Sequence, residues 1–296
     1  MTDKETQNKY EEIIMQEEIQ KELKEFEEEY NIEIISARDT GSRAWNLDSL
    51  SSDYDVSFIY VQKPADYITT SGYKQNIDRE TNTEHDIEYN SWNLDRFLAL
   101  LKGSNPAAIE YLQSDTTYYG KYSDYMNNLE THTEENFKPL ALMMHHHNLA
   151  KSQYERYLSQ KKKFTVKRHL YALRSLYYRE YVKKNRELPS LDFPEFFKEN
   201  KNIAPGFAPH TSHIKRMIKH KQNGNSTKKV NTNKIARQIG KQLQNTIPDE
   251  EKPDYTQQNI DTDYINQETK QLINEINQEP CTWKTILSTW KAHITS

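Results

Sequence analysis

The chain has 296 residues, of which 34% are hydrophobic and 28% are charged, and its formal net charge is −4. No stretch approaches the roughly 20 apolar residues that a membrane span needs, and the first residues lack the basic and apolar regions of a secretory signal. A single cysteine, Cys281, excludes a disulfide framework and a cysteine-built zinc site, so we expect a cytoplasmic protein with no membrane partner.

The N-terminal segment predicts a long, acidic helix. Residues 5–29 are mostly charged, and the apolar positions Ile13, Ile14, Leu23 and Phe26 form only a thin stripe. A helix of this kind keeps one face in solvent and buries the other. We therefore expect it to pack against a sheet formed by the residues that follow.

Residues 32–114 predict short strands followed by two helices. Runs rich in β-branched and aromatic residues predict strands at 32–37, 53–61 and 85–89. Apolar residues at helical spacing predict a helix over 93–103, and a proline near the start of 105–114 is typical of a helix N-terminus. This part of the chain is thus expected to hold a small mixed sheet.

The rest of the chain predicts helices only, and the polar stretch 219–233 predicts a linker or loop among them. The expected helices lie at 134–159, 164–186, 192–200, 210–221, 233–246, 264–278 and 282–294. The whole pattern predicts an α+β protein with a small mixed β-sheet followed by an α-helical region. We divide it into a sheet-bearing domain (1–132), a basic helical domain (133–225) and a polar linker with a C-terminal helical segment (226–296).

The residues with the clearest chemistry lie between 41 and 61. Gly41 and Ser42 are followed, after ten residues, by Asp53 and Asp55 at the start of a predicted strand. Side chains alternate along a strand, so the two carboxylates project from the same face. Paired carboxylates suit Mg²⁺ or Mn²⁺, and a glycine with a serine near a helix start suits phosphate. The spacing therefore predicts a metal and phosphate site.

This arrangement, with SWNLDRFLALLKGSNPAAIEYLQS downstream, resembles the nucleotidyltransferases related to DNA polymerase beta, in the branch that includes proteins associated with RNA repair. The resemblance covers roughly residues 32–185 and implies a polymerase-beta-like nucleotidyltransferase core. Two departures are Asn46, where the family usually has glycine, and residues 93–96, where an acidic residue and a Leu-Arg-Lys run are expected. Both bear on substrate positioning rather than on the metal carboxylates.

The resemblance also implies a third carboxylate on a neighbouring strand. The candidates are Asp86 and Glu88, which lie two residues apart on one strand face, so periodicity does not choose between them. Counting back from the aromatic residue before the 93–103 helix favours Glu88, with Asp86 in reserve. Asp53, Asp55 and this acid would then hold two metal ions that assist transfer of a nucleoside monophosphate from a nucleoside triphosphate, releasing pyrophosphate.

Positive charge is concentrated in the middle of the chain. Residues 151–184 hold 11 Lys and Arg against 2 acidic residues, and residues 201–229 hold 7 with no acidic residue. Lys167, Tyr171 and Arg174 share one helical face by their spacing, and we expect this face to reach over the triphosphate. A wider set on the same helix is a candidate nucleic-acid surface or a solvated face: Lys161, Lys162, Lys163, Arg168, Arg179, Lys183 and Lys184.

These expectations extend to the phosphates of the nucleotide and to the acceptor of the transferred group. Gly41 and Ser42 are expected to cradle the terminal phosphates, with Arg43 adding charge. The basic helices favour an RNA end as acceptor, and a partner protein, as in toxin–antitoxin adenylylating enzymes, is the main rival. A catalytically silent RNA- or protein-binding member of the same fold is the alternative from another class.

Overall fold

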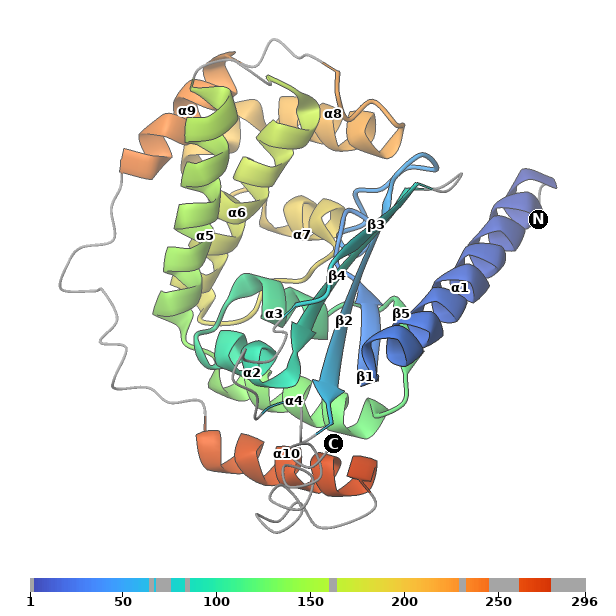
Figure 1. Ribbon diagram of the computed structural model, residues 1–296. Coiled ribbons are helices and arrows are strands. Elements are labelled where there is room, and N and C mark those ends of the chain that lie inside the picture. The colour runs from blue at the N-terminus through green and yellow to red at the C-terminus, as the bar shows by residue number, and fades with distance from the viewer. Residues whose placement is uncertain are drawn as a thin grey trace.

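The computed structural model describes residues 3–63, 67, 76–82, 86–159, 164–228, 233–244 and 261–277. Within these ranges five strands form one mixed sheet in the order β3-β4-β2-β1-β5 (Figure 1). The β2–β4 pairing is parallel and the others are antiparallel. The strands are β1 (Ile32–Asp39), β2 (Tyr54–Gln62), β3 (Arg79–Asn82), β4 (Asp86–Asn93) and β5 (Thr117–Gly120). The predicted small mixed sheet is confirmed.

Helix α1 (Asp3–Tyr30) covers one face of this sheet (Figure 1). Its buried side chains include Ile19, Leu23 and Phe26, which recur at helical spacing and pack against the buried face of β2. The predicted stripe is wrong at Ile13 and Ile14, which are 47% and 52% exposed. Both residues directly precede the buried Met15, and because each residue turns the helix by about 100°, they point away from the sheet.

The opposite face of the sheet is covered in its lower half by α2 (Leu94–Lys102), α3 (Pro106–Leu112) and α4 (Ser123–Asn136), with α10 (Thr262–Asn277) packed on α4. Asn93 and Asn105 cap α2 and α3 by accepting backbone N–H groups, as expected for residues that open a helix. Ile59 and Val61 of β2 are buried against these helices. These helices leave uncovered the half of the same face near the start of β2, which holds the candidate active site.

A helical region lies beside this half of the sheet and has its own core (Figure 1). Its largest helix–helix contact is between α5 and α6. The helix predicted over 134–159 is confirmed from Pro139 to Leu158, but its predicted start is wrong, because residues up to Asn136 belong to α4 and Pro139 begins a new helix. The helices here are α5 (Pro139–Gln153), α6 (Val166–Asn185), α7 (Phe193–Asn200), α8 (Thr211–Gln222) and α9 (Asn233–Gln244), with a π-helical segment at Tyr154–Leu158 and a 3₁₀ helix at Pro205–His210.

The predicted division into three domains stays a prediction, but its first boundary near residue 132 falls inside α4. The second falls in the turn after α8, where the backbone carbonyls of Ser226 and Lys228 accept N–H groups from the start of α6. The linker predicted over 219–233 is wrong at its start, because residues 219–222 belong to α8, and residues 229–232 lie outside the described part of the chain. The helix expected at 282–294 lies outside the described residues. Among described helices, none has the length and apolar character needed to cross a bilayer.

Candidate active site

Two of the predicted carboxylates meet where β2 and β4 run side by side. In the parallel register Asp55 lies directly opposite Glu88, so both side chains leave the sheet on one face. Asp53 is exposed and lies one residue ahead of β2, two positions before Asp55. Asp86 begins β4, and its side chain is outside the described part of the chain. The register thus brings together the pair that the sequence predicted.

The Asp55 carboxylate carries a charge that its surroundings oppose. Burial raises its pKa most, and the neighbouring Glu88 and Asp53 charges raise it further. The Lys167 charge and the Ser42 backbone N–H act in the opposite direction but leave a net increase. Among the described residues no three acidic, histidine or cysteine side chains converge as a ready ligand set. The described carboxylates of this site are therefore not gathered around one point.

The loop that carries Gly41 and Ser42 is fastened to the start of β2. The Thr40 N–H donates to the Asp55 carbonyl at 2.9 Å, and the Gly41 N–H donates to Asp39 Oδ1 at 3.0 Å. A Cβ at Gly41 would overlap the Asp55 carboxylate, so only glycine lets the loop approach this closely. Ser42, in the same loop, is buried, with 6% of its surface exposed. The loop and the carboxylates therefore form one unit.

Asn46 has a structural reason to occupy the position where the resembling family usually has glycine. Its φ is +52°, in the left-handed region, which asparagine tolerates better than most residues. Its Nδ2 donates to Asp192 Oδ2 at 2.7 Å, and its carbonyl accepts from Gln222 Nε2 at 2.9 Å. Asparagine thus keeps the backbone turn and adds contacts that tie the loop to the helical region.

Arg43 makes its contacts within the loop that carries Gly41 and Ser42. Its guanidinium donates to the Ser52 carbonyl at 3.0 Å, lies 3.6 Å from Asp48 and stacks over the Tyr54 ring at 3.9 Å. These contacts close the loop between its first residues and the start of β2. Arg43 thus holds the loop together, and its expected contact with phosphate stays a prediction.

The predicted face of α6 divides between two surroundings. Lys167 interacts electrostatically with Asp55, and Tyr171 lies close enough that burial, followed by the Asp55 charge, raises its pKa to about 12. Arg174 instead pairs with Glu110 at 3.0 Å, lies 3.7 Å over the Trp45 ring and is 6% exposed. The Arg174 charge is thus paired inside the fold, and its expected contact with the triphosphate stays a prediction.

Lys221 is a cation at the site that the sequence interpretation missed. It is 4% exposed on α8, and burial, reinforced by the Lys167 charge, lowers its pKa. Asp48, Asp53 and Asp55 act on the pKa in the other direction, so the ammonium group lies within electrostatic range of the site carboxylates. The signal was a lysine at i+7 from Ile214, on the apolar face of its helix.

The raised pKa of Asp39 predicts that the stability of the fold depends on pH. Burial raises its pKa from 3.8 to about 6, although it accepts from the Gly41 N–H and from the Tyr118 hydroxyl at 2.8 Å. A raised carboxyl pKa stabilises the fold fully below 3.8, and this contribution is lost as the pH rises through about 6. Asp39→Asn should therefore raise the melting temperature relative to wild type more at about pH 8 than at about pH 4. An equal difference at both pH values would contradict this.

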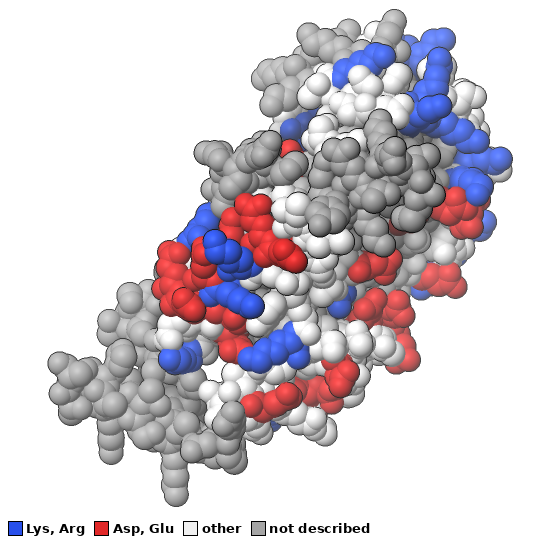
Figure 2. All heavy atoms as spheres, turned by 90° about the vertical axis from the view of Figure 1, so that its right-hand side faces the viewer, with Lys and Arg blue, Asp and Glu red and all other residues white. Residues whose placement is uncertain are grey.

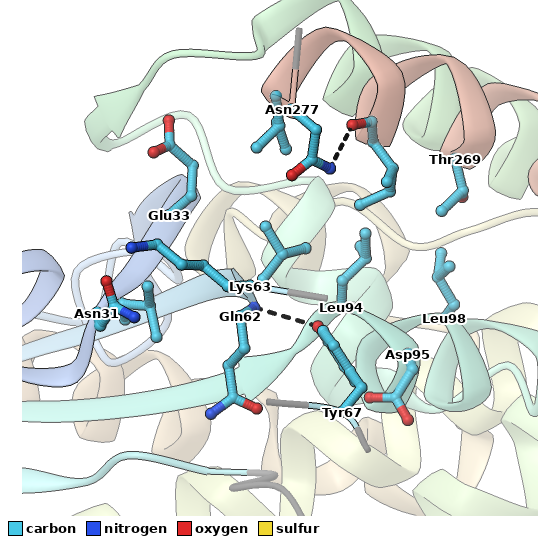
Figure 3. A pocket seen from close by; sticks show the side chains of 14 residues that line it. Asn31, Glu33, Gln62, Lys63, Tyr67, Leu94, Asp95, Leu98, Thr269 and Asn277 are labelled. Carbon is cyan, nitrogen blue, oxygen red and sulfur yellow. Dashed lines mark hydrogen bonds between the residues drawn. The ribbon is translucent and has the colours of Figure 1, made fainter. Parts of the chain in front are cut away.

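An apolar cavity lies at the far end of β2, and none of the residues of the carboxylate site lines it. It has a volume of about 460 Å³ and is lined by Leu94 and Leu98 of α2 and by Ile273 and Ile276 of α10. Figure 3 shows Tyr67 at its edge, where the tyrosine hydroxyl accepts from the Gln62 N–H at 3.2 Å. Its apolar walls and its distance along β2 from Asp55 separate it from the carboxylate site.

Comparisons with known proteins identify the family of the chain. Residues 15–270 match the model of the RNA repair pathway DNA polymerase beta family. The uncharacterized protein YcgL of Bacillus subtilis (strain 168) is 35% identical over 188 residues, which cover 62% of this chain and 70% of that protein. A nucleotidyltransferase-like protein from Exiguobacterium sibiricum 255-15 is 11% identical with a TM-score of 0.32, covering 76% of this chain and 74% of that one, which is a loose similarity. With most of its length matched by the family model, the chain belongs to the RNA repair pathway DNA polymerase beta family.

Proposed function

We propose that the protein transfers a nucleoside monophosphate from a nucleoside triphosphate to an acceptor hydroxyl and releases pyrophosphate. The observation that carries this proposal is the register that sets Asp55 beside Glu88, with Asp53 two residues away, opposite the cations Lys167 and Lys221. Negative groups that bind metal thus face positive groups that bind phosphate. A polar strand edge with a structural role alone would not need both.

The residues fit Mg²⁺ or Mn²⁺ by their chemistry. Asp53, Asp55 and Glu88 offer carboxylate oxygens, which these ions prefer, and the Asp55 charge is only partly compensated by Lys167. Asp86, two residues before Glu88 on β4, is the reserve ligand. A bound divalent ion would neutralise charge on the phosphates and polarise the phosphorus–oxygen bonds.

The chain's own groups supply the remaining tasks. The loop at Gly41 and Ser42 would bind the terminal phosphates, and Lys167 and Lys221 would offset their charge. The acceptor oxygen would form a bond to the α-phosphorus while the bond from that phosphorus to the bridging oxygen breaks. Glu88, which is exposed at the strand pair, would take the proton from the acceptor hydroxyl, and pyrophosphate would leave.

The acceptor we propose is an RNA end. Helix α8 exposes Lys215, Arg216 and Lys219 on the element that also carries Lys221, and Figure 2 shows basic side chains gathered toward the end of the molecule that holds α8 in Figure 1. Exposed cations of this kind bind a phosphate backbone. The family's description as an RNA repair pathway family supports the same acceptor. A partner protein as acceptor is the rival outcome.

The wider basic set on α6 is less suited to RNA than its composition predicts. Arg179 is 3% exposed and pairs with Glu180 at 2.6 Å, while Arg168 stacks over Tyr157 at 4.0 Å. Lys183 and Lys184 are exposed at the end of the helix, and Lys161, Lys162 and Lys163 lie outside the described residues. Part of the α6 charge is thus paired inside the fold, whereas Lys215, Arg216 and Lys219 of α8 are all exposed.

The proposal is tested by transfer from each α-³²P-labelled nucleoside triphosphate with Mg²⁺ or Mn²⁺. Short RNAs with a free 3′ hydroxyl and the protein itself serve as acceptors, and Asp53→Ala/Asp55→Ala serves as the inactive control. Label in RNA that depends on the carboxylates supports the proposal. Label only in protein would identify the adenylylating alternative. Absence of both label and metal-dependent triphosphate binding would leave a silent binding protein.

Lys221 gives a separate prediction about triphosphate affinity. Lys221→Met should weaken the binding of a magnesium triphosphate by about 10- to 100-fold, since a charge-assisted hydrogen bond contributes about 1.5–3 kcal/mol. Titration calorimetry measures the change. Lys234→Met is the matched control, because Lys234 is exposed on α9. Equal affinity in the two variants would remove Lys221 from the phosphate site.

A further inference from the structure

The apolar cavity at the far end of β2 is a groove between two helices. Leu94 and Leu98 point into it from α2 (Figure 3), and Ile273 and Ile276 line it from α10. Leu98, Ile273 and Ile276 pack against the buried core behind the groove, but each is only half-buried itself. Apolar side chains gathered around a hollow of about 460 Å³ mark a place where another apolar surface binds.

Helix α10 carries the chain along this groove to the last described residue before 278. Thr269, Ile273, Ile276 and Asn277 line the groove, so it follows one face of about the last two turns of the helix. Asn277 ends α10, and residues 278–296 follow it in the sequence. The chain therefore continues from the edge of the groove itself.

The residues that follow α10 carry an apolar face at helical spacing. Trp283, Ile286, Leu287 and Trp290 recur at i, i+3, i+4 and i+7, on one side of the helix that the sequence predicts over 282–294. Two tryptophans on such a face bring a large apolar area that water disfavours. This segment therefore has the chemistry that the groove requires of an occupant.

Residues 278–281 form a connection of the right length to turn the chain back along α10. Antiparallel helices are commonly joined by two to five residues, and this connection has four. Equal steps from such a turn set Trp283 opposite Ile276 and Trp290 opposite Thr269, and both of these α10 residues line the groove. A short connection also holds the segment near the groove at a concentration on the order of millimolar.

We propose that residues 282–294 dock into this groove as a helix, with Trp283 and Trp290 against Leu98 and the groove-lining face of α10. The occupant is thus a segment of the same chain, and it completes the apolar core at the far end of β2. The proposal is independent of nucleotidyl transfer, because the groove and Asp55 lie at opposite ends of β2.

Hydrogen exchange of the full chain, read by mass spectrometry, measures whether residues 282–294 are covered. Their amides should exchange about tenfold or more slowly in wild type than in Trp290→Lys, which places a charge on the apolar face. Thr285→Lys is the matched control. Position 285 falls on the opposite side of the predicted helix, so this variant should keep the protection of wild type.

Leu98→Lys tests the same contact from the side of the groove. Leu98 lines the groove and is half-buried, whereas its neighbour Ala99 is exposed on α2 and is not among the lining residues. Leu98→Lys should speed exchange in residues 282–294 as Trp290→Lys does, and Ala99→Lys should leave it unchanged. If Leu98→Lys does not fold, the comparison of Trp290→Lys with Thr285→Lys decides.

Protection that is lost in both Trp290→Lys and Leu98→Lys, in a chain that sediments as a monomer, supports the proposal. Exchange of residues 282–294 in wild type at the rate of an unstructured peptide would overturn it and leave the groove to another partner. Protection that survives Leu98→Lys in a folded chain would also overturn it, because the segment would then pack elsewhere. Protection that falls on dilution together with a dimer would assign the groove to a second copy instead.

Discussion

Asp55→Asn is expected to lower nucleotide transfer by about 10³-fold while raising the melting temperature. Metal-assisted charge neutralisation contributes several kcal/mol to a barrier, and each 1.4 kcal/mol is about tenfold in rate. The amide keeps a group that can accept from the Ser42 N–H but loses the charge that binds a cation. Activity is measured as label transferred from α-³²P nucleotides in the presence of Mg²⁺.

The stability gain follows from the sign of the Asp55 pKa shift. Burial, Glu88 and Asp53 raise this pKa, so the carboxyl stabilises the fold below its ordinary pKa of 3.8 and loses that contribution as the pH rises. At neutral pH the ionised group opposes folding, and an uncharged amide removes the repulsion. Asp115→Asn, at an exposed carboxylate, is the control and should change neither property. A fall in both activity and melting temperature for Asp55→Asn would indicate structural damage instead.

The elements that the sequence predicted are those with strong periodicity. The predicted strands at 32–37, 53–61 and 85–89 correspond to β1, β2 and β4, with shifts of only a few residues at most ends. Strands β3 and β5 were missed because each has four residues with no alternating pattern, RETN and TYYG. They form because longer strands offer them an edge, and β5 is held further by Gln20 Nε2 donating to the Tyr118 carbonyl at 2.9 Å.

The candidate site was predictable where its residues are close in sequence. The two-residue spacing of Asp53 and Asp55 places them on one face, but the pairing of Asp55 with Glu88 depends on a parallel register that spacing does not specify. Lys221 of α8 interacts electrostatically with these carboxylates. Its approach depends on how helices pack across the loop, so only its position on an apolar helical face indicated burial.

The helical spacing of α6 predicted a shared face but not a shared neighbour. Seven residues of helix advance about 10 Å along the axis, so Lys167 and Arg174 lie on one side at different heights. At the height of Lys167 the neighbour is Asp55, and at the height of Arg174 it is Glu110 on α3. A periodic pattern gives direction around a helix, and the tertiary fold decides what lies opposite.

Glu110 joins the loop that carries Gly41 and Ser42 to both the sheet-bearing part and the helical region. Its Oε2 accepts from Trp45 Nε1 at 3.0 Å, and its Oε1 lies 3.0 Å from the Arg174 guanidinium. The side chains of the ion pair are 12% and 7% exposed, so little water screens them. The Trp45 carbonyl also accepts from the Phe193 N–H at the start of α7, at 3.2 Å. Loss of the carboxylate would therefore release Trp45 on one side and leave a buried charge on the other.

Glu110→Ala is expected to reduce the free energy of unfolding by about 3–5 kcal/mol, because removing one partner leaves the other charge buried and uncompensated. Arg174→Met in the same chain should recover much of this loss, since no uncompensated charge then remains. Urea unfolding of the two single variants and the double variant measures the coupling. Glu195→Ala breaks an exposed pair with Lys198 and should cost far less than Glu110→Ala. Additive losses at Glu110 and Arg174 would show that the pair does not hold the loop as a unit.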